Sequence, residues 1–279
     1  MTHAARSLYL DLLKRCLVNL IYEDPAVRFT WDDSGPSTLV PFDHEQRRIG
    51  RDWPSQAHTM IGMRRLDNLQ ALVTDVLEAG TPGDLIEAGV WRGGATIFMR
   101  GVLKAHAVTD RTVWVADAFA KRFPVTEREG ASARSFVSPG WPEIRAVMSG
   151  ATSPSEAFRA RSDALWAGTT REEVEERFAR YGLLDDQVRF LRGWFRDTLP
   201  SAPIERLALL RLDGDLYDST FDALAALYPR LSVGGYVIVD DYNAVMESRE
   251  AVHAYLETAR TDAELQRIDA DAVFWQKRR

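Results

Sequence analysis

After Gly83, short apolar runs alternate along the chain with longer amphipathic segments. The apolar runs predict strands at 84–88, 113–117, 188–192, 207–213 and 235–240. The amphipathic segments predict helices at about 94–106, 171–181 and 220–231, the last of which would stop at Gly234-Gly235. Strands that are apolar throughout must be covered on both faces, so the alternation predicts a parallel sheet between two layers of helices. A final apolar run, 272–275, predicts a closing edge strand.

The residues before this alternation predict helices joined by an irregular segment. Leucines recur on one face of 7–22, and a second apolar stripe covers 64–78. Between them, residues 23–58 hold several prolines among Asp, Arg and Ser, which favours a surface segment or lid. We expect residues 1–80 to form N-terminal helices and a lid that belong to the same domain as residues 81–279.

One stretch fits the alternation badly. From about 120 to 170 the chain is rich in Arg, Ser, Gly, Pro and Ala, with Trp141 and Trp166 as isolated aromatic residues. Loops at the carboxyl ends of parallel strands are where ligands bind in such sheets. We therefore predict a specificity-determining insertion over that end of the sheet.

Composition narrows the class of protein. Of 279 residues, 46% are hydrophobic and 27% are charged, which is typical of a globular chain with one large core. The net charge of -6 predicts no nucleic-acid partner. The apolar runs are far shorter than the ~20 residues of a membrane span, which predicts no membrane partner. The chain starts without an apolar leader, and we therefore expect a cytoplasmic location. Cys16, the only cysteine, predicts neither a disulfide nor a cysteine metal cluster.

The first predicted strand of the sheet runs into a Gly-rich turn, Glu87-Ala88-Gly89-Val90-Trp91-Arg92-Gly93-Gly94. Its small residues would let a ligand approach the backbone, although a tight turn alone also needs glycines. The spacing is neither that of a phosphate loop nor the G-x-G-x-x-G dinucleotide motif. Asp117 ends the next strand, where a carboxylate can hold a ribose diol or simply cap a helix. Together the turn and this acid favour a nucleoside-type cofactor.

Aspartates also follow two later predicted strands. Asp213 and Asp215 come at the end of one, and Asp240 and Asp241 come at the end of the next. Either pair alone is common as capping or surface residues, but neighbouring parallel strands would bring Asp213, Asp240 and Asp241 together. Like charges this close need a proton or a cation between them. Three oxygen ligands without Cys or His predict Mg²⁺ or a similar ion.

Five motifs stand in an order that resembles one known family. They are TMIGMRRLDNLQ at 59–70, IEAGVWRGG at 86–94, GWFRDTLP at 193–200, LDGDLY at 212–217 and DDY at 240–242. Over about residues 55 to 275 the chain resembles the macrocin-type (TylF/MycF/NovP) sugar O-methyltransferases, which act on deoxysugars of natural products. The resemblance implies S-adenosylmethionine (SAM) as methyl donor and a Mg²⁺ site. It also implies the class I methyltransferase fold, a three-layer Rossmann-like α/β sheet of seven strands with one antiparallel.

The resemblance further implies roles for single residues. Seven would contact the donor: Thr59, Met60, Glu87, Gly89, Asp117, Gly193 and Trp194. Glu87 and Gly89 would line its methionine and sugar side, and Asp117 would hold the ribose hydroxyls. The Gly-Trp pair would border the adenine, and the Thr-Met pair would close over the donor from the N-terminal segment.

The metal ligands of the family match Asp213, Asp240 and Asp241, with Asp213 also placed as general base. In the expected reaction Mg²⁺ binds two vicinal sugar oxygens and lowers the pKa of one hydroxyl, whose proton Asp213 accepts. The loop after the second strand departs from the family pattern Asp-Ser-Phe-x-Gly. Here it is Asp117-Ala118-Phe119-Ala120-Lys121, which loses a hydroxyl and a glycine.

Other functions fit parts of the pattern. Asp213-Gly214-Asp215 has the D-x-D form with which metal-dependent glycosyltransferases hold a nucleotide sugar. A nicotinamide-dependent oxidoreductase and a non-catalytic partner subunit are further alternatives on the same type of sheet. His58 and His106 are rival bases, for which a surface position and a helix-end position are the simpler explanations. We expect a small glycoside as acceptor, and the leucine stripe of 7–22 is compatible with a homodimer.

Overall fold

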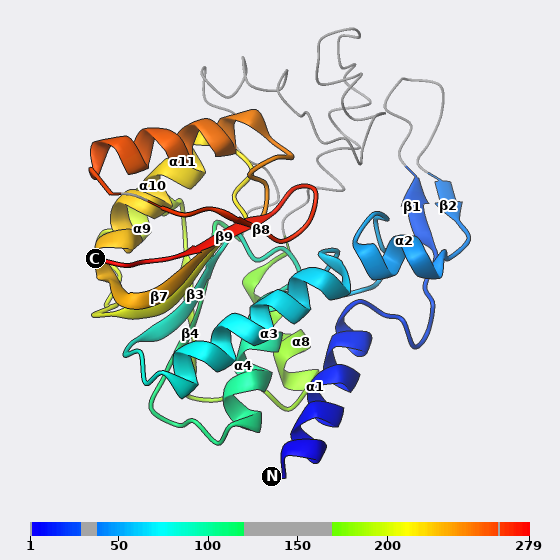
Figure 1. The fold of residues 1–279 in the computed structure, drawn as a ribbon. Helices are drawn as coiled ribbons and strands as arrows, with labels where there is room; N and C mark the ends of the chain where they lie inside the picture. Colours follow the sequence, from blue (N-terminus) through cyan, green and yellow to red (C-terminus); the bar gives the residue numbers. More distant parts are fainter. Residues whose placement is uncertain (1, 29–37, 120–168, 262) are drawn as a thin grey trace, which may run out of the picture.

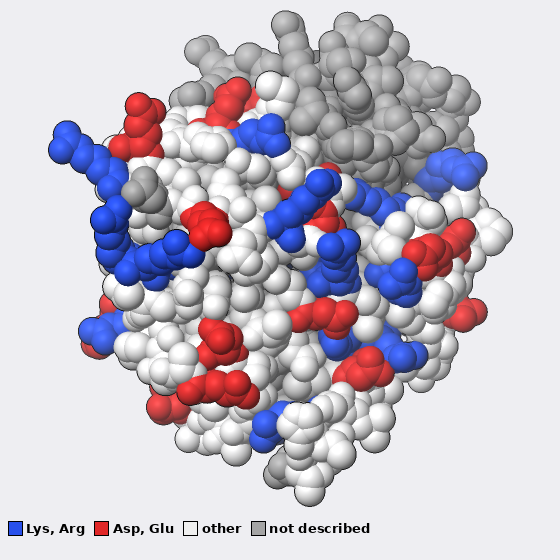
Figure 2. Space-filling model, viewed as in Figure 1, with Lys and Arg blue, Asp and Glu red and all other residues white. Residues whose placement is uncertain are grey.

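The computed structural model describes residues 2–28, 38–119, 169–261 and 263–279. The predicted insertion at about 120 to 170 therefore lies almost wholly outside the described residues. On the face shown in Figure 2, acidic and basic side chains of the described part are interspersed among uncharged ones. The charge of this face is therefore mixed in sign.

A seven-stranded sheet forms the centre of the described structure, in the order β5-β4-β3-β6-β7-β9-β8 (Figure 1). Its strands are β3 (Asp84–Ala88), β4 (Val113–Asp117), β5 (Val188–Arg192), β6 (Leu207–Leu212), β7 (Leu231–Val239), β8 (Gln266–Arg267) and β9 (Val273–Gln276). The first five in the sheet order are parallel, and β9 is antiparallel to both of its neighbours. The predicted α/β sheet of seven strands with one reversed strand is confirmed.

Helices cover both faces of this sheet, which completes the predicted three layers (Figure 1). One layer contains α1 (His3–Leu17), α3 (Gly62–Glu78), α4 (Gly94–Ala105) and α8 (Arg171–Arg180); the other contains α9 (Phe195–Thr198), α10 (Tyr217–Leu227) and α11 (Met246–Thr258). Successive strand residues alternate between the layers, so Leu85 packs in the first and Ile86 in the second. β3, β4 and β6 are therefore buried on both faces and mostly apolar, with Glu87 and Arg211 as an ion pair among their apolar residues. Within the described residues, no helix has the length and apolarity to cross a membrane.

Two expectations about the end of the sheet were wrong. Gly234-Gly235 does not stop a helix: α10 ends at Leu227, and both glycines lie inside β7. A Cβ on Gly235 would lie 2.8 Å from the carbonyl oxygen of Ala208, so this glycine allows β7 to approach β6. The strand at 272–275 is not an edge, because β9 lies between β7 and β8. The edge strand β8 has only two residues, both exposed, and so leaves no apolar signal in the sequence.

The leucine stripe of the first helix packs on its own chain. Leu10, Leu13 and Leu17 of α1 are buried in the same core cluster as α3, α4 and the sheet. Leu8 and Leu12 lie on the other side of the helix and are exposed. The buried stripe therefore belongs to the core beneath α4.

The segment between α1 and α3 lies beyond the start of α3, at the right of Figure 1. It contains the antiparallel pair β1 (Ala26–Arg28) and β2 (Thr38–Val40), followed by α2 (His44–Ile49).

The expected surface position of residues 23–58 is wrong for the centre of this segment. Arg47 is only 1% exposed, because its guanidinium contacts Asp24 at 2.5 Å, Asp52 at 2.8 Å and the carbonyl of Val18 at 3.1 Å. A buried cation is tolerated where its donors are paired in this way. The cluster determines the path of the chain toward residue 59.

Candidate active site

The N-terminal segment crosses the Gly-rich turn at the start of α4. The amide of Gly94 donates to the carbonyl of His58 at 3.0 Å, and a Cβ on Gly94 would lie 2.5 Å from that oxygen. Arg92 in the turn donates to the same segment, at the carbonyl of Ala57, at 2.8 Å. These contacts place Thr59, which is 4% exposed, against the N-terminus of α4.

Gly89 lies where the end of β3 passes the residues after β6. Its φ is +91°, and a Cβ there would lie 1.9 Å from the carbonyl oxygen of Asp213. The amide of Asp213 in turn donates to the carbonyl of Ala88 at 2.9 Å. Protein atoms therefore fill the space beside this glycine, and chain packing alone requires glycine here. This packing supports, at Gly89, the alternative in which the tight turn itself needs its glycines.

Asp117 joins the carboxyl ends of three strands. Its Oδ2 accepts from the amide of Val90 and its Oδ1 from the amide of Phe119, both at 2.9 Å. Its carbonyl accepts from the amide of Gly193 at 3.0 Å, and the next residue, Trp194, is the N-cap of the short helix α9. Burial raises the pKa of the Asp117 carboxyl, although these backbone hydrogen bonds act in the opposite direction. The residue expected to hold a ribose thus also ties the Gly-rich turn to β4 and β5.

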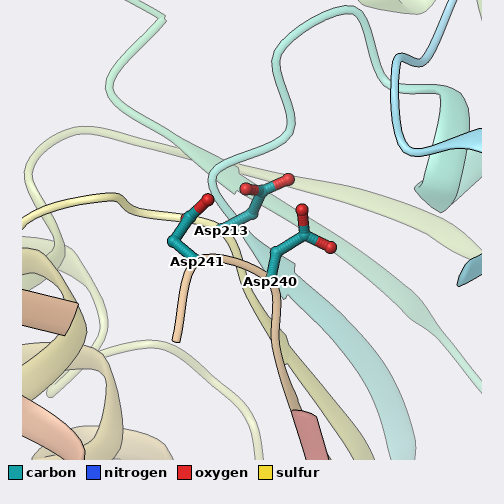
Figure 3. A group of neighbouring side chains, drawn as sticks. All are labelled: Asp213, Asp240 and Asp241. Atoms are coloured by element: carbon teal, nitrogen blue, oxygen red, sulfur yellow. The ribbon is translucent and has the colours of Figure 1, made fainter. Parts of the chain in front are cut away.

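Three aspartates come together at the ends of β6 and β7 (Figure 3). One carboxylate oxygen of each of Asp213, Asp240 and Asp241 lies within 4.8 Å of the others. The side chain of Asp213 is 26% exposed and that of Asp240 only 6%. The parallel pairing of β6 with β7 produces this convergence, since both strands end at the same edge of the sheet.

Two arginines to which the sequence analysis assigned no role contact these acids. Arg211 on β6 pairs with Glu87, with Asp240 and, at 2.8 Å, with Asp213. Arg65 on α3 also pairs with Asp240. A signal for Arg211 was present in the sequence, because a cation within an apolar strand needs buried partners. Arg65 stood in the motif at 59–70 without any indication of its partner.

Negative charge nevertheless remains in excess among the described residues of the cluster. Burial, and next repulsion from the neighbouring aspartates, raises the pKa of Asp215 to about 7 and that of Asp241 well above its usual range. Burial raises the pKa of Glu87 to about 8 against the attraction of Arg211, and its buried Oε2 has no hydrogen-bond partner in the described structure. Three hard oxygen donors in such an acidic site fit Mg²⁺.

His58 is not the surface residue that the sequence suggested. It is half-buried, and its Nδ1 lies 3.0 Å from the hydroxyl of Tyr181. Burial, followed by the charges of Arg177 and Arg92, lowers the pKa of His58 to about 4. His106 is the C-cap residue of α4, which matches its expected helix-end position.

The lowered pKa of His58 implies a pH-dependent stability. Because the unfolded chain binds a proton near pH 6.5 and the folded chain only near pH 4, His58 reduces stability as the pH falls through this window and not above it. Allowing for its partial exposure, we expect a loss of about 1–2 kcal/mol at pH 5 relative to pH 7. Urea unfolding at both pH values would measure this loss. It should shrink in His58→Gln and persist in His3→Gln, which changes an exposed histidine; an identical loss in both variants would contradict the assignment.

A family model and three curated proteins match almost the whole chain. The model of the macrocin O-methyltransferase (TylF) family matches residues 6–135 and 152–277. The 8-demethyl-8-(2,3-dimethoxy-alpha-L-rhamnosyl)-tetracenomycin-C 4'-O-methyltransferase of Streptomyces olivaceus is 50% identical, over 99% of this chain and 95% of its own length. Demethyldecarbamoylnovobiocin O-methyltransferase of Streptomyces niveus is 48% identical over 100% of this chain and 96% of its own. Mycinamicin III 3''-O-methyltransferase of Micromonospora griseorubida is 46% identical over 97% and 96%.

Solved structures agree with these matches. The O-methyltransferase NovP superposes with a TM-score of 0.81 at 47% identity, covering 98% of this chain and 100% of that one. A calicheamicin methyltransferase at 17% identity, with a TM-score of 0.53 over 99% of this chain and 94% of its own, shares the fold. These matches replace the glycosyltransferase, oxidoreductase and non-catalytic alternatives with a single assignment. The chain belongs to the macrocin O-methyltransferase family, whose members are SAM-dependent O-methyltransferases.

Proposed function

We propose that this enzyme transfers the methyl group of SAM to a hydroxyl of a deoxysugar on a natural-product glycoside. The observation that carries the proposal is the cluster of Asp213, Asp240 and Asp241 beside the Gly-rich turn. The names of the relatives support the substrate class, since they refer to a rhamnosyl-tetracenomycin, a novobiocin precursor and mycinamicin III. Their identity of 46% to 50% extends over nearly the whole chain.

The donor would bind at the carboxyl ends of β3, β4 and β5. The residues proposed to contact it are Thr59, Met60, Glu87, Gly89, Asp117, Gly193 and Trp194. Two observations support this position: the segment that carries Thr59 lies against the start of α4, and Asp117 bonds both to the Gly-rich turn and to Gly193. The unpartnered Oε2 of Glu87 is a buried acceptor for which a ligand would provide a donor.

The metal site would bind the acceptor sugar and help to deprotonate its hydroxyl. When bound, SAM would provide a methyl group already activated on its sulfonium, and Mg²⁺ held by the three aspartates would supply a Lewis acid that makes a sugar hydroxyl easier to deprotonate. Asp213 is more exposed than Asp240, so we assign it the additional task of accepting the hydroxyl proton. The 2.8 Å contact from Arg211 to its Oδ2 holds this carboxylate in place. The side chains thus align an oxygen and remove its proton.

Calorimetric titration with S-adenosylhomocysteine (SAH), with and without Mg²⁺, tests the donor site before an acceptor is known. We expect the wild type to bind SAH. We expect Asp117→Ala to bind it at least about tenfold more weakly, because the change removes the expected ribose acceptor and the hydrogen bonds to the amides of Val90 and Phe119. Asp185→Ala, a change of a more exposed aspartate that pairs with Arg100, is the matched control and should bind SAH normally.

Methyl transfer itself would be measured by the mass gain of deoxysugar glycosides incubated with SAM. We expect turnover to be lost on chelation and restored by Mg²⁺. Failure of the folded wild type to bind SAH would reject the donor site. Full turnover in the presence of a chelator would reject metal assistance and leave the methyltransferase assignment intact.

A further inference from the structure

Arg65 connects one aspartate of the proposed metal site to a distant turn of the chain. It lies in the first turn of α3, and its side chain is 12% exposed. Its Nη1 donates to Oδ2 of Asp240. Its Nε and Nη2 donate to the two carboxylate oxygens of Asp269, at 2.6 and 3.1 Å, and Nη2 lies 3.5 Å from Asp271. One planar guanidinium thus bridges acids at the end of β7 and in the turn before β9.

Asp240 is held from two sides. Arg65 contacts its Oδ2, and Arg211 contacts its Oδ1. Asp213 is held by Arg211 at one oxygen only, and Asp241 makes no ion pair within the described residues. The direction of the Asp240 carboxylate therefore depends on two arginines, of which Arg65 is the one outside the sheet.

The other partners of Arg65 are themselves anchored. Oδ1 of Asp269 accepts from the amides of Asp271 and Ala272, both at 2.9 Å, so this turn is closed around the carboxylate. Asp271 also pairs with Arg51 of the N-terminal segment at 2.5 Å. Arg65 is consequently held at a fixed position, as a group that orients a metal ligand must be.

We propose that Arg65 is a positioning residue of the metal site, which orients Asp240 toward the cation while Asp269 holds its guanidinium in place. The inference rests on the proposed function, because it requires a cation at Asp213, Asp240 and Asp241. Lysine at this position keeps the positive charge but has no planar fork, so it cannot bridge Asp240 and Asp269 at once. Substitution by lysine therefore separates the effect of orientation from that of charge.

The affinity for Mn²⁺, measured in the absence of SAH from the electron paramagnetic resonance signal of the free ion, tests this role independently of activity. We expect Arg65→Lys to weaken Mn²⁺ binding about 10–100-fold, while the Kd for SAH changes less than about threefold. Asp269→Asn should weaken Mn²⁺ binding in the same direction by a smaller factor, because it loosens the anchor and leaves Arg65 in place.

Arg100→Lys is the matched control. Arg100 also extends from a helix, is 5% exposed and forms a two-point contact with one aspartate, Asp185, at 2.9 and 2.5 Å. The Arg100→Lys variant should bind Mn²⁺ with the affinity of the wild type.

Each of the remaining outcomes would overturn the inference for a different reason. Wild-type Mn²⁺ affinity in Arg65→Lys would reject the positioning role and leave the proposed function standing. Equal losses of Mn²⁺ and SAH affinity in Arg65→Lys, or an equal loss of Mn²⁺ affinity in Arg100→Lys, would show a general effect on folding instead. A wild type that binds no Mn²⁺ would reject the metal site itself, and the positioning role with it.

Discussion

Asp213→Asn should reduce kcat for methyl transfer by about 10²–10⁴-fold while SAH affinity stays within a few-fold of wild type. Asparagine has nearly the same shape as aspartate but cannot accept the hydroxyl proton, and its neutral amide is a weaker metal ligand. The side chain lies at the end of β6, on the acceptor side of the proposed site. Single-turnover methylation of a deoxysugar glycoside, combined with SAH calorimetry, measures both quantities.

Asp215→Asn is the matched control for this experiment. Asp215 stands in the same loop with a φ of +58°, a conformation that asparagine tolerates, and it is not among the proposed ligands. We expect its kcat to change less than tenfold. Full activity in Asp213→Asn would remove Asp213 from the mechanism, and equal losses in both variants would favour a general charge effect over proton transfer.

Gly89→Ala should lower the free energy of unfolding by about 3–5 kcal/mol, among the largest effects of a single methyl group in this chain. The added Cβ would lie 1.9 Å from the backbone oxygen of Asp213, and the φ of +91° is one that alanine rarely adopts. Since the obstructing atom is backbone, the ends of β3 and β6 must separate. Denaturant unfolding measures the loss, and weakened Mn²⁺ binding would report the displacement of Asp213.

Gly182→Ala separates the two causes. Gly182 also has a positive φ, +63°, but a Cβ there meets nothing within 4 Å. This variant should lose only about 1 kcal/mol, the cost of the left-handed backbone for alanine. Similar losses of unfolding free energy at both positions would mean that the ends of β3 and β6 relax around the added methyl group. The close approach of Gly89 to Asp213 would then contribute little to the loss.

The strands nearest the donor side could be predicted to the residue. The ranges 84–88, 113–117 and 188–192 match β3, β4 and β5, because each is a short run with clear polar boundaries. The helix predicted at 171–181 matches α8 closely for a similar reason, since Thr170 forms a capping box with Glu173. Local patterns suffice where an element's limits are set by its own residues.

The order of five short motifs was enough to identify the family, which the comparisons confirm. The convergence of Asp213, Asp240 and Asp241 also followed from the sequence, because consecutive parallel strands end at one edge of the sheet. Their proposed ligand and base roles await the measurements described above.

The layered α/β fold, the family and the acids that gather at the strand ends could all be inferred from local residue patterns and short motifs. The charges that those acids meet became known only from the packing of the folded chain. Arg65 and Asp240 are 175 residues apart in the chain, and Arg211 and Glu87 are 124 apart. Periodicity records which side of an element is buried, whereas the partner of a buried charge depends on which distant segments pack together. The burial of Arg47 and the requirement for glycine at position 89 could not be predicted for the same reason, because both follow from contacts between segments distant in the sequence.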